Sequence, residues 1–296
     1  MKIAKRNQVY YEHSRFNDPG IIVNPGDIFK AETELNTGSW LTSTSDNWLP
    51  EKSEKPNPTV CIEIAGAEPG DVLKINVQDI KLEEFGYTGY NGQKHPLANL
   101  IYSKKWGINT KTVPIKDNYI HWNETKKIPV EPMIGTMGVA PATEVLKNTK
   151  GGIHGGNMDV NEVTSGNIIY LPVFVPGALL HLGDVHAIQG DGEINGAGGI
   201  ECRSLLTLKV DIIKKPKNMN WIRIESDDYI MTVSCCRSVE ESFYEAAREM
   251  IFWMVNGFNY TENEAYLLMG EVMEARCTQF VNPTRTYICK MPKKYL

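Results

Sequence analysis

The sequence contains no long apolar segment and no excess of positive charge. Its N-terminus lacks the apolar stretch of a secretory signal peptide. The most apolar run, 168–182, is too short to span a bilayer and is interrupted by two prolines and a glycine. The net charge is −5, whereas binding to nucleic-acid phosphates requires a basic surface. These absences predict a cytoplasmic protein that binds neither membranes nor nucleic acids.

The cysteines do not form a Cys-x-x-Cys pair. They are Cys61, Cys202, Cys235, Cys236, Cys277 and Cys289. Without that spacing, the sequence does not indicate a zinc site built from thiolates. In a reducing compartment these side chains are expected to be small buried hydrophobes. Cys202, which follows Glu201, is kept as an alternative nucleophile.

Turn-forming residues precede several short apolar segments. Asn24-Pro25-Gly26-Asp27 precedes 28–30, Glu68-Pro69-Gly70-Asp71 precedes 72–77, and Ser165-Gly166-Asn167 precedes 168–170. In the first two, proline presets φ and glycine accepts a positive φ, as a type II turn requires. Repeated turn-then-strand units predict an antiparallel sandwich or barrel. The 296 residues are enough for a large core.

The C-terminal part of the chain has helical periodicity. A capping-box pattern at 238–241 precedes apolar residues at helical spacing, and Gly257 is expected to end that helix. A second capping box at 261–264 predicts a helix through Ala275. A final strand is expected over 284–290.

The predicted fold is therefore mainly β, an antiparallel sandwich or barrel with a C-terminal α/β portion, and α+β overall. A β-rich catalytic region is expected over 1–215, with sub-domains that could be interleaved. An α+β region over 216–296 is expected to pack on it. Loops are predicted over 37–58 and 85–100, and the tyrosines and histidine of the second loop are unassigned candidates for a pocket wall.

The stretch 151–202 carries the side chains best suited to chemistry. Two polar clusters lie among glycines, and the apolar segment 168–182, predicted to be a strand pair that holds them in register, separates them. The clusters are His154, Asn157 and Asp159, followed by Asp184, His186, Gln189, Asp191 and Glu193. In an extended chain, side chains two positions apart share a face, so Asp184 and His186 can converge. Imidazole and carboxylate together are the mixed ligand set of zinc or a similar divalent ion.

A series of motifs resembles the acetamidase/formamidase family. The strings are G-A-E-P-G-D-V-L at 66–73, G-x-x-G-V-A-P at 135–141, H-G-G-N-M-D at 154–159, L-P-V-x-V-P-G-A-L at 171–179 and G-D-x-H-A-x-Q-G-D-G-E at 183–193. The resemblance implies hydrolysis of small amides such as formamide and acetamide to the carboxylate and ammonia. It also implies a mostly β fold with a C-terminal α/β part, and a homodimer or larger homo-oligomer. One departure is Asn36, where the family often has an acid.

The resemblance and the side-chain chemistry together predict a metal-assisted hydrolase. The predicted ligands of a divalent metal are His154, Asp159, Asp184, His186 and Asp191, with Glu144 and Glu201 as weaker candidates. The predicted ion is zinc by ligand type, with calcium left open for a structural site. Glu193 is predicted to be the general base, and Asn157 and Gln189 are predicted to stabilise the oxyanion.

Two alternatives are kept beside this hypothesis. One is covalent catalysis through Cys202 within the same enzyme class. The other is a non-catalytic, β-rich binding or scaffold protein that has the same fold and contains a metal ion.

Overall fold

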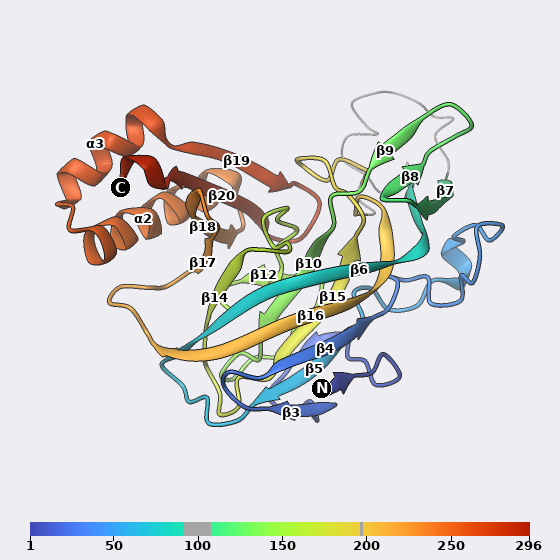
Figure 1. Cartoon of the computed structure of the whole chain (residues 1–296), viewed down its shortest axis with the longest axis horizontal. Coiled ribbons are helices and arrows are strands. Elements are labelled where there is room, and N and C mark those ends of the chain that lie inside the picture. Colours follow the sequence, from blue (N-terminus) through green and yellow to red (C-terminus); the bar gives the residue numbers. More distant parts are fainter. Residues whose placement is uncertain (92–107, 196–197) are drawn as a thin grey trace.

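The computed structural model describes residues 1–91, 108–195 and 198–296, and most of its regular structure is β-strand (Figure 1). The strands are β1 Ile3–Ala4, β2 Glu12–His13, β3 Ile21–Val23, β4 Ile28–Thr33, β5 Thr59–Ile64, β6 Asp71–Asn91, β7 Ile108–Lys116, β8 Tyr119–His121, β9 Lys127–Pro129, β10 Met133–Val139, β11 Leu146–Lys147, β12 Gly151–Gly152, β13 Gly155–Asn157, β14 Ile168–Pro172, β15 Leu180–His186, β16 Glu201–Lys214, β17 Ile222–Glu225, β18 Tyr229–Cys236, β19 Glu274–Gln279 and β20 Arg285–Pro292. The helices are α2 Val239–Phe258 and α3 Glu262–Val272, with short 3-10 helices at Pro50–Lys52 and Lys293–Tyr295. The predicted mainly β, α+β fold is confirmed.

Two long strands, β6 and β16, form the centre of the main sheet. They pair antiparallel from Tyr87–Glu201 to Asp71–Lys214 and lie side by side across Figure 1. On the other edge of each strand, β6 pairs with β7 and β14, and β16 pairs with β4. Apart from β1–β4 and β3–β5, the pairs between named strands in the described chain are antiparallel. The sheet therefore joins segments that are far apart in the sequence.

The three predicted turns each precede a strand. Gly26, Gly70 and Gly166, before β4, β6 and β14, have φ values of 89°, 91° and 90°. Only glycine adopts this conformation readily. The predicted loop over 85–100 is wrong for 85–91, because that segment continues β6 and pairs with β7. The rest of that loop, 92–100, lies outside the described residues.

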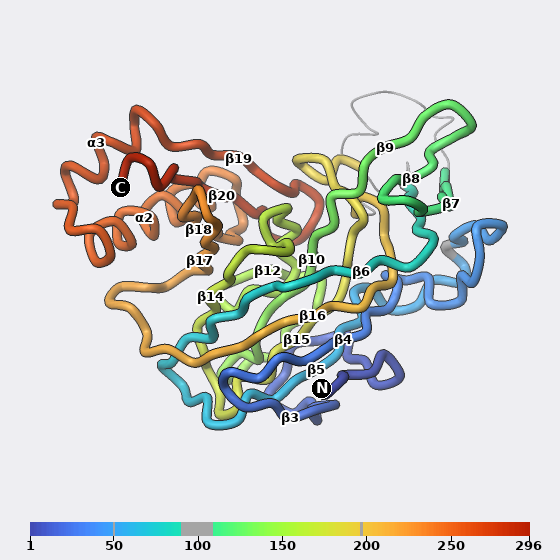
Figure 2. The backbone as a smooth tube through the Cα atoms, in the orientation of Figure 1, coloured from blue at the N-terminus to red at the C-terminus, as the bar shows by residue number. Residues whose placement is uncertain are grey.

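The C-terminal helices pack on the last strands of the chain. Met250 and Met254 of α2 share a core with Ala265 of α3 and with Ile230 and Met291 of the strands below. β17 pairs with both β18 and β14, which connects these strands to the main sheet. Figure 2 shows the C-terminus beside the helices, while the N-terminal strands lie toward the opposite end. The boundary near residue 215 stays a prediction.

Both helices begin where the sequence predicts, but they end at other residues than predicted. α2 begins after Ser238 and α3 after Thr261, and each cap side chain accepts a hydrogen bond from the amide three residues on. α2 continues through Gly257 to Phe258 and is capped by Asn259, which takes the left-handed conformation with φ 60°. Ala275 is not helical, because it belongs to β19 and pairs with β20. Within the described residues, no helix is long and apolar enough to cross a membrane.

A buried ion pair fixes α2 to β17. The guanidinium of Arg223 lies 2.6 Å from the carboxylate of Glu249, and their side chains are 3% and 1% exposed. The second oxygen of Glu249 accepts a hydrogen bond of 2.9 Å from the amide of Asn220. The guanidinium also lies 5.0 Å from the ring centre of Trp253. Because both charges are buried, each depends on the other for stabilisation.

Three histidines lie together in the core near β10. The ring centres of His13 and His154 are 5.0 Å apart, and those of His13 and His181 are 4.6 Å apart. Burial lowers the pKa of His154 to about 4 and that of His181 to about 3, and it holds the pKa of His13 well below the usual value. All three imidazoles are therefore neutral near pH 7.

Replacing Arg223 with Met should lower the free energy of unfolding by about 3–5 kcal/mol, because Glu249 is left buried without its partner. The control is Arg248→Met, which breaks the exposed pair with Glu245 on the same helix. That change should cost less than about 1 kcal/mol. Urea unfolding followed by circular dichroism measures both. Equal losses in the two variants would contradict a stabilising role for the buried pair.

The histidine cluster should make the fold sensitive to acid. Unfolded histidines take up protons near pH 6.5, whereas burial lowers the pKa of folded His154 to about 4, that of His181 to about 3, and that of His13 well below the usual value. The unfolded state binds more protons in that window, so stability falls as the pH drops, by roughly 1.4 kcal/mol per pH unit for each histidine. Urea midpoints of chelator-treated protein at pH 7, 6 and 5 should show a shallower slope for His13→Asn. The partly exposed His121→Asn should leave the slope unchanged, and equal slopes in all three proteins would refute the interpretation.

Candidate metal centre and active site

Strand β10 brings the two polar clusters together. All seven of its residues are buried, and it pairs with β13 on one edge and with β15 on the other. Thr136 lies opposite Asn157 in β13 and opposite Gly183 in β15. The prediction that the apolar segment 168–182 forms a strand pair holding the clusters in register is wrong. β14 pairs with β6 and β17, whereas β15 pairs with β5, β10 and β16.

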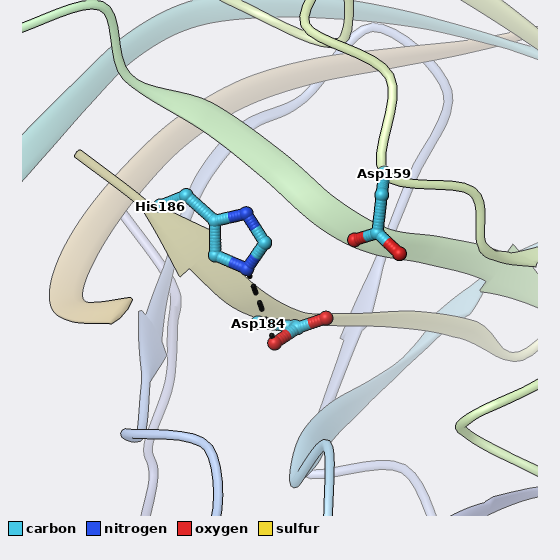
Figure 3. A group of neighbouring side chains, drawn as sticks. All are labelled: Asp159, Asp184 and His186. Carbon is cyan, nitrogen blue, oxygen red and sulfur yellow. Dashed lines mark ion pairs between the residues drawn. The ribbon is translucent and has the colours of Figure 1, made fainter. Parts of the chain in front are cut away.

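Asp159, Asp184 and His186 converge at this place (Figure 3). Each offers one ligand atom, and these atoms lie within 4.8 Å of one another. His186 Nε2 lies 3.5 Å from Asp184 Oδ1. All three side chains are buried, yet Asp159 Oδ1, Asp184 Oδ1 and both ring nitrogens of His186 have no hydrogen-bond partner among the described residues. Buried polar atoms are rarely left in this state unless they bind water or an ion.

Glu201 and Glu193 flank the three converging residues. Glu201 is paired with His186 across β15 and β16, and its Oε1 lies 3.5 Å from His186 Nε2. Glu193 Oε1 accepts a hydrogen bond of 2.9 Å from the amide of Gly198. The second oxygen of each glutamate has no hydrogen-bond partner within the part of the chain described. Four buried carboxylates thus surround a single imidazole.

The pKa values reflect this crowding. Burial, followed by the charge of Asp184, raises the pKa of Glu201 to about 7. Burial also raises the pKa of Glu193 to about 7, against the charge of His186. Burial and the charges of Glu193 and Asp184 raise the pKa of Asp159. Although burial lowers it, the pKa of His186 is raised on balance by Glu201 and Asp184. A divalent cation would relieve the same repulsion, and the oxygen and imidazole donors fit zinc.

Glycines leave the room that these groups occupy. A Cβ atom on Gly135 would lie 2.6 Å from Asp159 Oδ1 and 3.0 Å from Asp184 Oδ2. A Cβ atom on Gly198 would lie 2.5 Å from both His186 Nε2 and Glu201 Oε1. Separations this short are sterically forbidden, so these positions require glycine as long as the ligand atoms stay where they are.

Neighbouring amide and hydroxyl groups contact the carboxylate oxygens that do not face the centre. Asp159 Oδ2 accepts a hydrogen bond of 2.6 Å from Asn282, and its backbone carbonyl accepts one of 3.3 Å from Gln189. Asp184 Oδ2 accepts a hydrogen bond of 2.7 Å from Asn57, and the hydroxyl oxygen of Thr136 lies 3.1 Å from it. Sequence reasoning missed Asn57, Thr136 and Asn282, because single amides and hydroxyls in unrelated segments carry no local signal.

The backbone is also unusual at this site. Asp159, Asp184 and Glu193 have φ values of 49°, 58° and 48°, and Asn57 has 53°. Residues other than glycine seldom adopt positive φ, and such strain is concentrated at functional sites. These four positions lie in the centre itself or in direct contact with it.

The structure does not bring Asp191 and His154 into this centre. The side chain of Asp191 is 58% exposed and lies 2.7 Å from Arg276 Nε, at the surface. His154 packs against His13 in the buried histidine cluster. Glu144, one of the weaker ligand candidates, is exposed to solvent.

Cys202 lies near the centre in sequence but is unsuited to be a nucleophile. It is buried, and its thiol contacts the carbonyl of Phe85 at 3.3 Å. Burial raises its pKa to about 12. The thiolate that a nucleophilic mechanism needs is therefore disfavoured.

Comparisons with known proteins agree with this architecture. The family model described as the Acetamidase/Formamidase family matches residues 8–152 and 149–294. An acetamidase of Mycolicibacterium smegmatis is 28% identical over 71% of this chain and 68% of its own length. A formamidase of Methylophilus methylotrophus is 26% identical over 65% of this chain, and the match covers 61% of that protein.

The similarity extends over the whole fold. The crystal structure of an acetamidase from Bacillus halodurans superposes with a TM-score of 0.91 and 28% identity, covering 99% of this chain and 98% of that one. The two parts of the family match together, and the full-length structural match, include the strands that carry the centre. The chain belongs to the acetamidase/formamidase family.

Proposed function

We propose that this chain, an amidase by family, hydrolyses short linear amides such as formamide and acetamide to the carboxylate and ammonia. The observation that carries the proposal is a set of buried atoms on Asp159, Asp184 and His186 that could bind a metal and that have no hydrogen-bond partner among the described residues. Glu193 lies beside them. The names of the relatives, acetamidase and formamidase, support the substrate class. They favour an enzyme over a non-catalytic binding or scaffold protein.

Asp159, Asp184 and His186 would hold the metal ion. Zinc is the proposed metal, because its usual protein ligands include imidazole nitrogen and carboxylate oxygen at low coordination number. Calcium takes six to eight oxygen ligands, so the imidazole disfavours it. When bound, such an ion polarises a carbonyl oxygen and lowers the pKa of a coordinated water.

Glu193 is proposed to move the proton. Its carboxylate would take a proton from the attacking water and return it to the leaving nitrogen, which then departs as ammonia. Burial raises the pKa of Glu193, which suits a group that must both accept and donate a proton near neutral pH. The amide of Gly198 fixes Oε1, and this leaves Oε2 free for the water.

Asn157 is proposed to stabilise the oxyanion. Its Oδ1 accepts hydrogen bonds of 2.7 Å from Thr136 and 2.8 Å from Asn57. Its NH₂ group is therefore the end left to donate to charge that develops on the amide oxygen. Gln189 acts less directly, since its amide donates to the backbone of Asp159. Glu201 accepts a hydrogen bond from Asn36, and its Oε1 lies 3.5 Å from His186 Nε2, which keeps it as the weaker candidate for a metal ligand.

Two further expectations complete the proposal. We expect assembly into a homodimer or larger homo-oligomer, as the family resemblance implies. A cytoplasmic location also stays a prediction.

Replacing Glu193 with Gln should lower kcat for acetamide by roughly 10²–10⁴-fold, because the general base is lost while the side chain keeps its shape. Metal content should stay at the wild-type level. The matched control, Glu144→Gln, changes an exposed glutamate and should retain full activity. Ammonia release and elemental analysis give both readouts. Undiminished turnover in Glu193→Gln would rule out the proposed base.

Replacing Asp184 with Asn should remove the bound metal and the activity together, because one anionic ligand is lost. Asp191→Asn, which changes an exposed aspartate, should keep both. Chelation of the wild-type protein should abolish ammonia release, and added zinc should restore it. Activity in fully metal-depleted protein would contradict the metal-assisted mechanism. If Asp191→Asn instead lost its metal, the ligand set would have to be revised.

A further inference from the structure

Asn57 lies at the junction of several groups in the candidate centre. Its side chain is 3% exposed, and its Nδ2 donates to Asp184 Oδ2 at 2.7 Å and to Asn157 Oδ1 at 2.8 Å. Thr136 Oγ1 lies 3.2 Å from the same nitrogen. One amide group therefore contacts both the proposed metal ligand and the proposed oxyanion donor.

The chemistry of these partners determines which end of each amide faces the other. An ionised carboxylate only accepts hydrogen bonds, so the NH₂ end of Asn57 must face Asp184. The same NH₂ group then requires an acceptor from Asn157, which turns the Asn157 oxygen inward and its NH₂ end outward. Because Asn57 occupies Oδ2 of Asp184, Oδ1 is the oxygen left without a hydrogen-bond partner among the described residues and is the one that would face the metal.

The backbone of Asn57 is held on both sides. Its amide donates to Asn36 Oδ1 at 2.9 Å, and its carbonyl accepts a hydrogen bond of 2.7 Å from Asn148. Its φ is 53°, although the following Pro58 favours an extended conformation. Such a conformation persists only where the surroundings fix it, and it is typical of functional sites.

The link through Asn36 reaches a second part of the centre. Asn36 Nδ2 donates to Glu201 Oε1 at 3.1 Å, while its Oδ1 accepts from the backbone of Asn57. The two asparagines thus connect Asp184 to Glu201 on the far side of His186. A carboxylate at position 36 could not donate to Glu201 without taking up a proton.

We propose that Asn57 is the positioning residue of this centre, fixing which oxygen of Asp184 faces the metal and which end of Asn157 faces the substrate. The proposal rests on the function proposed above and assigns Asn57 no contact with the substrate. It predicts that loss of the side-chain amide impairs both metal binding and turnover while the fold is kept. Residues that orient metal ligands in this way typically change affinity or activity by about 10–100-fold when they are replaced.

The test uses Asn57→Gly, since glycine tolerates the positive φ and only the side-chain amide is lost. The zinc dissociation constant of metal-stripped protein, measured by competition with a chromophoric chelator, should rise about 10–100-fold. Asn259→Gly is the matched backbone control, because Asn259 also has a left-handed φ of 60° and lies at the end of α2. Asn17→Ala is the control for a buried amide, which donates to the Glu12 carbonyl at 2.8 Å. Both controls should bind zinc as the wild type does.

Asn57→Asp gives a second readout and covers the case in which the glycine variant does not fold. Aspartate has the same shape and also tolerates positive φ, but when ionised it cannot donate to Asp184 or Asn157. A space-filling role predicts wild-type kcat for this variant, whereas a positioning role predicts a loss of at least about tenfold. Wild-type zinc affinity in Asn57→Gly, or wild-type kcat in Asn57→Asp, would overturn the proposal. If the wild-type protein itself binds no zinc or releases no ammonia, the proposed function fails instead.

Discussion

Repulsion between buried carboxylates is the main constraint on the structure around His186. Asp159, Asp184, Glu193 and Glu201 are each at most 7% exposed, and in the described part of the chain the ion pairs of this group are those of His186 with Asp184 and Glu201. Like charges this close cannot all stay ionised without compensation, which comes from bound protons or from a cation. The raised pKa values show the proton-bound alternative. A divalent ion bound here would exchange those protons for coordination bonds, so metal binding would be coupled to proton release.

The pairing of the strands brings these carboxylates together. β10 lies between β13 and β15, so the carboxylates reach the centre from segments on both edges of β10. Gly135 within β10 leaves the space in which two of the carboxylates meet. β16 adds Glu201 opposite His186, and the C-terminal segment adds Asn282 against Asp159. The centre exists only when strands from distant parts of the sequence are paired.

The sequence predicted the parts of the site that are local. The alternation of Asp184 and His186 and the nearby Asp159 were enough to predict a mixed ligand set, and those three residues do converge. Asp191 followed the same alternation, but a turn at 190–193 breaks the extended backbone and exposes it. The fold class followed from the turns and capping boxes, which are local as well. β10, Asn57 and Asn282 could not be found this way, since their roles depend on long-range pairing that leaves no periodic trace.

The left-handed backbone at Asp159, Asp184 and Glu193 restricts how this centre can change. Aspartate and asparagine adopt positive φ at modest cost, whereas β-branched and bulky residues do so rarely. An exchange of Asp184 for a β-branched or bulky residue would therefore be opposed by the backbone before any effect on metal coordination. Each of these positions therefore accepts a narrower set of side chains than its chemistry alone would allow.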